Sequence, residues 1–209
     1  MPVDIQTLLI FIPIAFALNL TPGPDMLFCL GEGSRSGPRA GLAAALGVTT
    51  GLLILSVAAG LGVAAVLATH SLAFEIVRWA GVLYLLWQAI QIFRHPPGHL
   101  YAAPGNPSDL YSAWRKGVLV CTLNPKVTLF ILALVPQFVD PAKGSVFLQF
   151  LIFGVIIGIG GTFINGSVGA FAGGVGRFLQ RNPYVGRIVH YGSGLLFVGL
   201  AAKLAFERR

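Results

Sequence analysis

The feature that most limits how this chain can fold is a series of long apolar runs separated by short polar stretches. About 20 apolar residues in a helix span the hydrocarbon core of a bilayer, and several runs reach that length. The chain of 209 residues is 56% hydrophobic and only 10% charged, whereas a soluble domain carries about 25% charged residues. We therefore expect an all-α membrane protein in which residues 1–209 form a single membrane domain, without a separate soluble domain.

Six transmembrane helices are predicted from these runs. Their approximate ranges are 5–30, 40–67, 76–93, 117–139, 146–170 and 188–206. Residues 94–116 are rich in Pro, Gly and polar residues, which is typical of a loop. This loop separates residues 1–93 from residues 117–209, and each of these two parts holds three of the predicted helices.

The basic residues predict how the chain is oriented in the membrane. The loops after the first, third and fifth spans carry most of them: Arg35, Arg39, Arg94, Arg115, Lys116, Arg177, Arg181 and Arg187. The other side carries fewer: Arg78, Lys143, Lys203, Arg208 and Arg209. Because basic loops stay in the cytoplasm, we expect the linker 94–116 to be cytoplasmic and both termini to lie outside. The net charge of +7 is then spread over loops near lipid headgroups, and no nucleic-acid partner is indicated.

The first predicted span is interrupted at Pro22, Gly23 and Pro24, with Asp25 directly after the break. Proline has no N–H, and its ring clashes with the carbonyl one turn back. In hydrocarbon each unsatisfied carbonyl costs several kcal/mol. The break is therefore expected to pack against protein or to line a polar cavity.

The fourth predicted span contains a similar break, and this similarity suggests an internal repeat. NLTP (19–22) matches TLNP (122–125) with Asn and Thr exchanged, and residues 79–93 align with residues 192–206. Because each copy would cross the membrane three times, the second copy would be inverted relative to the first. The predicted fold is thus two inverted three-helix repeats, with helices 1 and 4 broken at proline motifs. Such repeats are typical of secondary transporters, whose substrate site lies near mid-membrane where the breaks meet.

Each predicted break has one charged residue next to it, Asp25 in the first and Lys126 in the second. An isolated charge at mid-membrane costs roughly 3 kcal/mol on insertion scales, so the two charges are expected to face each other. Our hypothesis is that Asp25 binds the ammonium group of a substrate or carries a proton. Lys126 would neutralise Asp25 in one state and bind the substrate carboxylate in another. The alternative is that the two residues form a purely structural ion pair.

The motifs TPGPD (21–25) and LNPK (123–126) resemble those of the LysE/RhtB family of bacterial amino-acid exporters. The resemblance extends to GLAAALGVTTG (41–51), to LNPKVTLFILALVPQFVDP (123–141) and to the Gly-containing last helix. It implies a small multi-pass protein of the bacterial inner membrane that exports amino acids or related metabolites using the proton gradient. It also identifies the residues at the family's motif positions: Thr21, Pro22, Gly23, Pro24, Asp25, Asn124, Pro125 and Lys126. At the position of Asp25, some members of the family have Asn.

A few further polar residues fall within apolar helices. Asn19, Gln88 and Asn165 would line the substrate path, or would form interhelical hydrogen bonds worth about 1 kcal/mol each. Glu32 and Arg35 are expected at the headgroup boundary. The four histidines lack metal-ligand spacing, so neither a metal nor another cofactor is expected.

The function expected from these features is export of amino acids or close derivatives by proton antiport with alternating access. The partners would be an amino acid with an uncharged or apolar side chain, protons and membrane lipid, and the protein would be a monomer or homodimer. An enzyme is not expected, because no nucleophile–His–acid set or HExxH motif is present. Two alternatives are a passive channel and a thiol–disulfide electron carrier that uses Cys29 and Cys121. The two cysteines are offset differently from their prolines, which is unfavourable for such a carrier.

Overall fold

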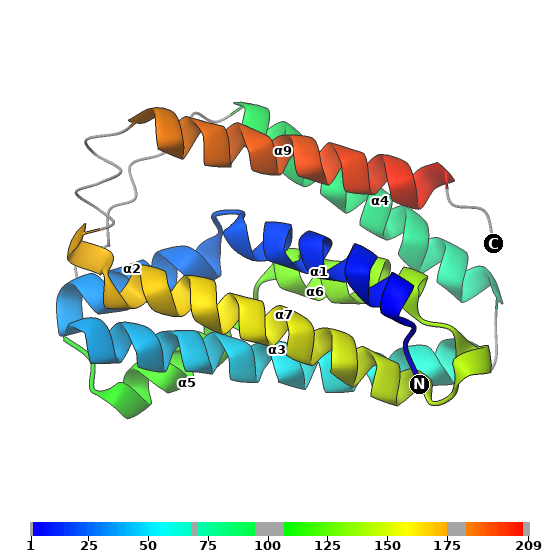
Figure 1. The fold of residues 1–209 in the computed structure, drawn as a ribbon, viewed down its shortest axis with the longest axis horizontal. Coiled ribbons are helices and arrows are strands. Elements are labelled where there is room, and N and C mark those ends of the chain that lie inside the picture. Colours follow the sequence, from blue (N-terminus) through cyan, green and yellow to red (C-terminus); the bar gives the residue numbers. More distant parts are fainter. Residues whose placement is uncertain (1, 68–70, 95–106, 175–182, 207–209) are drawn as a thin grey trace.

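In a computed structural model, every regular element is helical, and the described ranges contain no strand (Figure 1). The described residues are 2–67, 71–94, 107–174 and 183–206, and within 63–92 and 183–204 only part of the side chains is described. The long helices run roughly along the longest axis of the molecule. The prediction of an all-α fold is therefore confirmed for the described residues.

The first span is broken where the sequence predicts it. Helix α1 (Ile5–Leu20) and helix α2 (Pro24–Ser36) meet at an angle of 53°. Proline suits the first position of α2, where its missing N–H would have no helical partner. Helix α2 ends at Ser36 and is followed by Gly37, whose φ of +87° lies in the left-handed region that glycine adopts readily.

The second broken span consists of several short helical pieces. Helix α5 (Leu110–Thr122) is followed by α6 (Pro125–Leu129), the π-helical turn η1 (Phe130–Leu134) and the 3-10 turn η2 (Val135–Phe138). The bend at this break is 51°, close to that of the first break. The prediction of two proline-broken helices is therefore confirmed.

The predicted linker 94–116 is wrong over its last residues, because α5 begins at Leu110 and not near residue 117. The Asp109 side chain accepts a hydrogen bond from the Ser112 backbone N–H at 2.6 Å and caps this helix. The first turns of α5 are amphipathic: they bury Ala113 and Gly117 and expose polar side chains. The polar residues of these turns led to the prediction of a loop, whereas the structure has a capped helix that packs on the bundle.

Four further helices are unbroken: α3 (Pro38–Leu67), α4 (Ser71–Arg94), α7 (Val146–Ala170) and α9 (Pro183–Phe206). Over Pro38–Gly62 and Val146–Ala170, α3 and α7 are long and apolar enough to cross a membrane. Up to four spans result if each bent pair counts as one. The arrangement of six helices as an inverted repeat stays a prediction.

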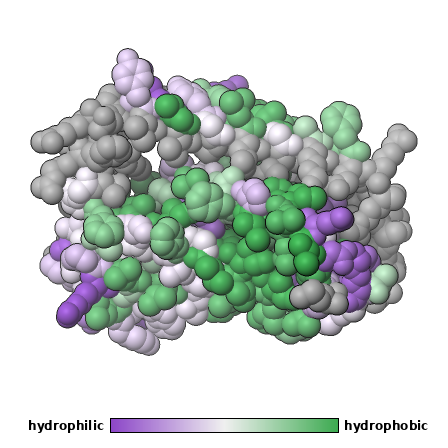
Figure 2. Space-filling model, in the orientation of Figure 1, coloured by the Kyte–Doolittle hydropathy of each residue, from purple (hydrophilic) through white to green (hydrophobic). Residues whose placement is uncertain are grey.

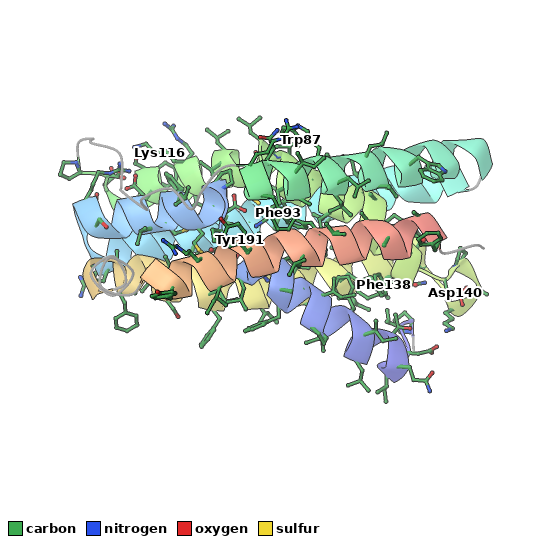
Figure 3. The ribbon with its side chains drawn as sticks, turned by 90° about the horizontal axis from the view of Figure 1, so that it is seen from above. Trp87, Phe93, Lys116, Phe138, Asp140 and Tyr191 are labelled. Carbon is green, nitrogen blue, oxygen red and sulfur yellow. The ribbon has the colours of Figure 1, made fainter. Side chains whose placement is uncertain are left out.

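The helices form two layers (Figure 1). In the larger layer, α3 packs mainly against α7 and α5, and α2 packs against α3 and α7. In the smaller layer, α4 packs along α9 and touches the larger layer mostly through η1. Figure 3 shows Phe93 of α4 beside Tyr191 of α9, and their rings stack with centroids 6.2 Å apart.

Glycines allow α2, α3 and α7 to approach closely at one end of the larger layer. A Cβ added to Gly33 would lie 1.9 Å from the carbonyl oxygen of Gly169, and one added to Gly41 would lie 2.6 Å from the same oxygen. Any side chain here would force the helices apart. We call these three residues the glycine crossing. The same end carries the basic residues Arg35, Arg39, Arg115 and Lys116, and we call it the basic end.

At the other end, Lys143 of the turn η3 (Pro141–Lys143) forms an ion pair with Asp4, the residue before α1. The hydrogen bond with Asp4 raises the pKa of Lys143 above its ordinary value. A second carboxylate, that of Asp140, lies 3.6 Å from the same ammonium. These exposed charges connect the start of α1 to the turn that precedes α7.

Large apolar side chains are exposed on the outward faces of the helices. Examples are Leu9 on α1, Phe163 on α7 and Ile188 on α9, with exposed fractions of 65%, 74% and 72%. Figure 2 shows apolar side chains over the middle of one face, with hydrophilic residues mainly toward the ends. Such a surface suits a lipid environment better than water.

Candidate functional site

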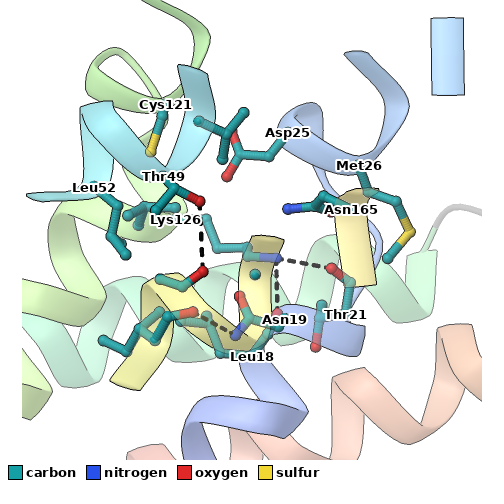
Figure 4. A pocket seen from close by; sticks show the side chains of 15 residues that line it. Leu18, Asn19, Thr21, Asp25, Met26, Thr49, Leu52, Cys121, Lys126 and Asn165 are labelled. Atoms are coloured by element: carbon teal, nitrogen blue, oxygen red, sulfur yellow. Dashed lines mark hydrogen bonds between the residues drawn. The ribbon is translucent and has the colours of Figure 1, made fainter. Parts of the chain in front are cut away.

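The two helix breaks are joined by the side chain of Lys126. Its Nζ donates hydrogen bonds to the carbonyl oxygens of Thr21 at 2.8 Å and Leu18 at 3.1 Å (Figure 4). The Leu18 carbonyl cannot accept from the residue four positions on, because that residue is Pro22, which has no N–H. Its only described backbone donor is the Thr21 N–H at 3.3 Å. The ammonium thus takes the place of missing backbone donors at the negative end of the α1 dipole.

Asp25 lies in the first turn of α2 and is buried, with 8% of its surface exposed. Its Oδ1 atom has no hydrogen-bond partner among the described residues. The Asn124 amide lies next to it, yet the Nδ2 atom of Asn124 also makes no hydrogen bond of acceptable geometry. The carboxylate therefore keeps an oxygen available, and a carboxamide donor lies beside it.

The described ion pairs do not include one between Asp25 and Lys126. The charge of Lys126 still acts on the Asp25 carboxylate through space, but the ammonium is held by backbone carbonyls. In this structure, therefore, Lys126 does not neutralise Asp25 by direct contact. The sequence comparison of the breaks gave no signal for this, because it compares side chains and the partners of Lys126 are backbone atoms.

Helices α2 and α6 differ in how their N-termini are capped. The Asn124 Oδ1 atom accepts a hydrogen bond from the Lys126 backbone N–H at 3.0 Å, which caps α6. Helix α2 has Gly23 at the corresponding position and no side-chain cap. A Cβ at Gly23 would lie 3.2 Å from Lys126 Nζ, so the missing side chain leaves room for the ammonium.

A small cavity lies where the breaks meet (Figure 4). Six polar residues line it: Asn19, Thr21, Asp25, Thr49, Lys126 and Asn165. Its apolar walls include Leu18, Met26, Val48, Leu52, Val127 and Ile157. The space open to the centre of a water-sized sphere is about 20 Å³, and one water needs about 10–15 Å³ by this measure. The cavity therefore holds a group the size of a water and not a whole amino acid.

Helix α7 closes one side of the cavity through hydrogen bonds to other helices. Asn19 Nδ2 donates to the Ile157 carbonyl oxygen at 3.0 Å, and the hydroxyls of Thr49 and Thr162 are 2.5 Å apart. Asn19 therefore both lines the cavity and forms an interhelical hydrogen bond. The sequence did not single out the threonine pair, because two threonines in apolar helices give no sign that they face each other.

The predicted site residues gather at or beside this cavity. Five of them line it: Asn19, Thr21, Asp25, Lys126 and Asn165. Five others form the breaks next to it: Pro22, Gly23, Pro24, Asn124 and Pro125. The side chain of Gln88 lies outside the described residues. The roles of these residues in transport stay predictions.

Both cysteines, Cys29 and Cys121, are buried free thiols. Cys121 lines the cavity, and Cys29 lies further along α2. They do not form a disulfide in this structure. Over the described ranges, His, Cys, Asp and Glu form no group of three that could hold a metal ion.

The structure buries Glu32 more deeply than its polar sequence surroundings suggest. Only 2% of its surface is exposed, so it is buried within the bundle, and its predicted depth at the headgroup boundary stays a prediction. Its Oε1 atom accepts a hydrogen bond from Arg35 Nη2 at 2.9 Å. Burial of Glu32 was not evident from the sequence because an acidic residue followed by Arg, Ser and Gly resembles the polar end of a span.

Comparison with known protein families shows a match over nearly the whole chain. The model of the LysE type translocator family matches residues 16–208. The chain is 34% identical to a leucine efflux protein of Enterobacter sp. over 91% of each chain. It is 30% identical to an uncharacterized membrane protein of Vibrio cholerae, over 97% of this chain and 98% of the other. It is 29% identical to a homoserine/homoserine lactone efflux protein of Salmonella typhimurium, over 91% and 92%. No solved structure matches the chain.

Proposed function

Because the chain belongs to the LysE type translocator family, we propose that it exports amino acids or close derivatives across the bacterial inner membrane by proton antiport with alternating access. Members of this family are transporters and not enzymes. Two relatives are named for efflux of leucine and of homoserine or its lactone. These names support an amino-acid substrate for the present chain.

The observation that best supports this function is the meeting of two broken, oppositely charged helices at a buried cavity. A zwitterionic amino acid needs an acceptor for its ammonium group and donors for its carboxylate. The free Oδ1 atom of Asp25 would accept the ammonium or a proton. The free Asn124 amide and the uncapped N-terminus of α2 would donate to the carboxylate. Lys126 would then exchange its backbone partners for the substrate carboxylate.

The cavity walls favour a substrate with an uncharged, apolar side chain. Apart from Asp25 and Lys126, the residues that line the cavity are neutral, and the backbone groups of an amino acid would engage both charges. The substrate side chain would then lie against Leu52, Val127 and Ile157. Because the present cavity is too small for an amino acid, transport requires helix movements that enlarge it and open it to each side in turn.

The arrangement of the helices supports two inverted repeats of three helices each. The two breaks bend by 53° and 51°, and the helices that would correspond pack together as α3 with α7 and α4 with α9. Residues 1–93 would form one repeat and residues 117–209 the other, with a cytoplasmic connection between them. The breaks would meet near mid-membrane, as in other transporters with such repeats. The protein would act as a monomer or a homodimer.

Amino-acid profiling of bacteria with and without overexpression would test this proposal. We expect overexpression to lower the intracellular amount of one or a few amino acids and to raise the extracellular amount. An uncoupler and the Asp25→Asn variant should each abolish the change, whereas Asp4→Asn, which alters an exposed carboxylate far from the cavity, should preserve it. An unchanged profile for every amino acid would reject the proposal.

The same experiment separates the two alternative functions. Export that is insensitive to the uncoupler and never proceeds against a gradient would indicate a passive channel. A double Cys29→Ser and Cys121→Ser variant tests the electron carrier, because such a carrier loses all function without its thiols. We expect this double variant to export normally.

A further inference from the structure

Carboxylates are scarce in the larger layer of the bundle, and their placement is specific. The described helices α1, α2, α3, α5, α6 and α7 together contain two acidic residues, Asp25 and Glu32, and both are on α2. Both are buried, with 8% and 2% of their surface exposed. The function proposed above uses Asp25 and leaves Glu32 without a role.

Asp25 and Glu32 lie on the same face of α2. Their separation of seven residues corresponds to two helical turns, or about 10 Å along the axis. Cys29 lies between them on this face and is fully buried. The face runs from the cavity toward the basic end, where Gly33 packs against Gly169.

Each of the two carboxylates has one oxygen without a partner. Glu32 Oε1 accepts from Arg35 Nη2 at 2.9 Å, but Oε2 is buried and has no hydrogen-bond partner in the described part of the chain. Asp25 Oδ1 is in the same situation. Native proteins satisfy most buried polar atoms, so each unsatisfied one calls for an explanation. If the ion pair between Glu32 and Arg35 only connected two turns of α2, Oε2 would not have to be buried without a hydrogen bond.

Among the described residues, few charged groups belong to the helices packed around Glu32. Helix α7 has no acidic, basic or histidine residue, α3 has only Arg39, and Arg115 and Lys116 of α5 are exposed, as is Arg39. Arg35, on the next turn of α2, is the described basic residue in contact with Glu32. A proton on Oε2 would neutralise the carboxylate and remove its ionic contact with Arg35 Nη2.

We propose that Glu32 is a second proton-binding site, which works in series with Asp25 along the inner face of α2. This inference rests on the proposed function, since it assigns a further residue to its proton coupling. Protons would bind to Glu32 from the basic end when α2 separates from Gly41 and Gly169 at the glycine crossing. They would reach Asp25, or leave it, along the shared face. Arg35 would hold the ionised form of Glu32 while the crossing is closed.

The test uses the full-length protein reconstituted in proteoliposomes, with L-leucine and L-homoserine as probes. Two modes are measured: exchange of amino acid at equal pH on both sides, and transport driven by an imposed pH gradient. We expect Glu32→Gln to keep exchange within about twofold, to lose gradient-driven transport by about tenfold or more, and to flatten its pH dependence. The control Asp4→Asn removes an exposed carboxylate and should leave both modes unchanged.

The Glu32→Asp variant keeps a titratable group in this position while shortening the bond to Arg35. We expect it to retain gradient-driven transport with a changed pH dependence, which would exclude a purely structural role. Gradient-driven transport by Glu32→Gln equal to that of Asp4→Asn would overturn the inference. So would equal losses of both modes in Glu32→Gln and Glu32→Asp. Wild-type protein that transports neither probe in either mode, with export also lacking in cells, would instead reject the proposed function.

Discussion

The two breaks bend their helices almost equally, by 53° and 51°, yet their polar groups are used very differently. At the second break, Asn124 caps α6 and Lys126 binds two carbonyl oxygens, so most polar atoms already have partners. At the first break, α2 has no side-chain cap and Asp25 keeps a free oxygen. The two breaks thus have nearly equal geometry and different chemistry. Lys126 of the second break stabilises the first, whereas the first keeps polar groups without described partners.

The largest effect is expected for Lys126→Ala. A small effect of this variant would contradict the conclusion that the second break stabilises the first. The variant leaves the carbonyl of Thr21 without its donor and the carbonyl of Leu18 with only the Thr21 backbone N–H at 3.3 Å. Hydrogen bonds to charged groups are worth about 1.5–3 kcal/mol each, so we expect the free energy of unfolding to fall by about 3 kcal/mol. Transport should fall to background. Thermal unfolding in detergent and proteoliposome transport measure the two effects, and Lys116→Ala, at an exposed lysine, is the control.

Asp25→Asn should give the next largest effect, and its sign on stability should differ from that of Lys126→Ala. We expect gradient-driven transport to fall about tenfold or more. Stability should stay the same or rise, because a neutral amide replaces a buried carboxylate that has an unpartnered oxygen. Both are measured in the same assays. A loss of stability as large as that of Lys126→Ala would mean that Asp25 is part of the structural connection.

Asn124→Ala should have an intermediate effect and sharpen the contrast between capped and uncapped breaks. Loss of the bond to the Lys126 backbone N–H should destabilise the protein by about 1 kcal/mol. Transport should fall severalfold, because a free amide donor beside Asp25 is also lost. Asn124→Asp keeps the cap and removes the donor. A decrease in transport for Asn124→Ala but not for Asn124→Asp would assign the effect to the cap alone.

The smallest effect is expected for Pro125→Ala. Proline at the first position of α6 removes an N–H that has no helical partner anyway, and Asn124 still caps the helix. We expect a change in stability below about 1 kcal/mol and nearly normal transport. A large loss in thermal unfolding would show that the proline, and not the cap, maintains the second break.

Much of the fold follows from sequence, because apolar length and proline have strong local effects. The span predicted over 146–170 coincides with α7, which starts after the cap Ser145. The breaks at Pro22 and Pro125 were equally predictable. The start of α5 was not, because an amphipathic helix that packs on a bundle has the composition of a loop.

The candidate site was predictable as a set of residues but not as a set of contacts. Pro22 and Pro125 indicated where the chain breaks, and Asp25 and Lys126 indicated where charge would gather. That Lys126 binds carbonyl oxygens depends on how far apart the breaks lie, which no local pattern encodes. Burial of Glu32 likewise depends on how α2 packs against α3 and α7, which no local pattern encodes.

The small size of the cavity has a kinetic consequence. The cavity, with a volume of about 20 Å³, does not admit an amino acid unless the helices move. The rate of transport would then be limited by how often the bundle opens and not by how fast the substrate diffuses to it. Cooling, or a stiffer bilayer, would slow such a carrier far more steeply than it slows a permanently open pore.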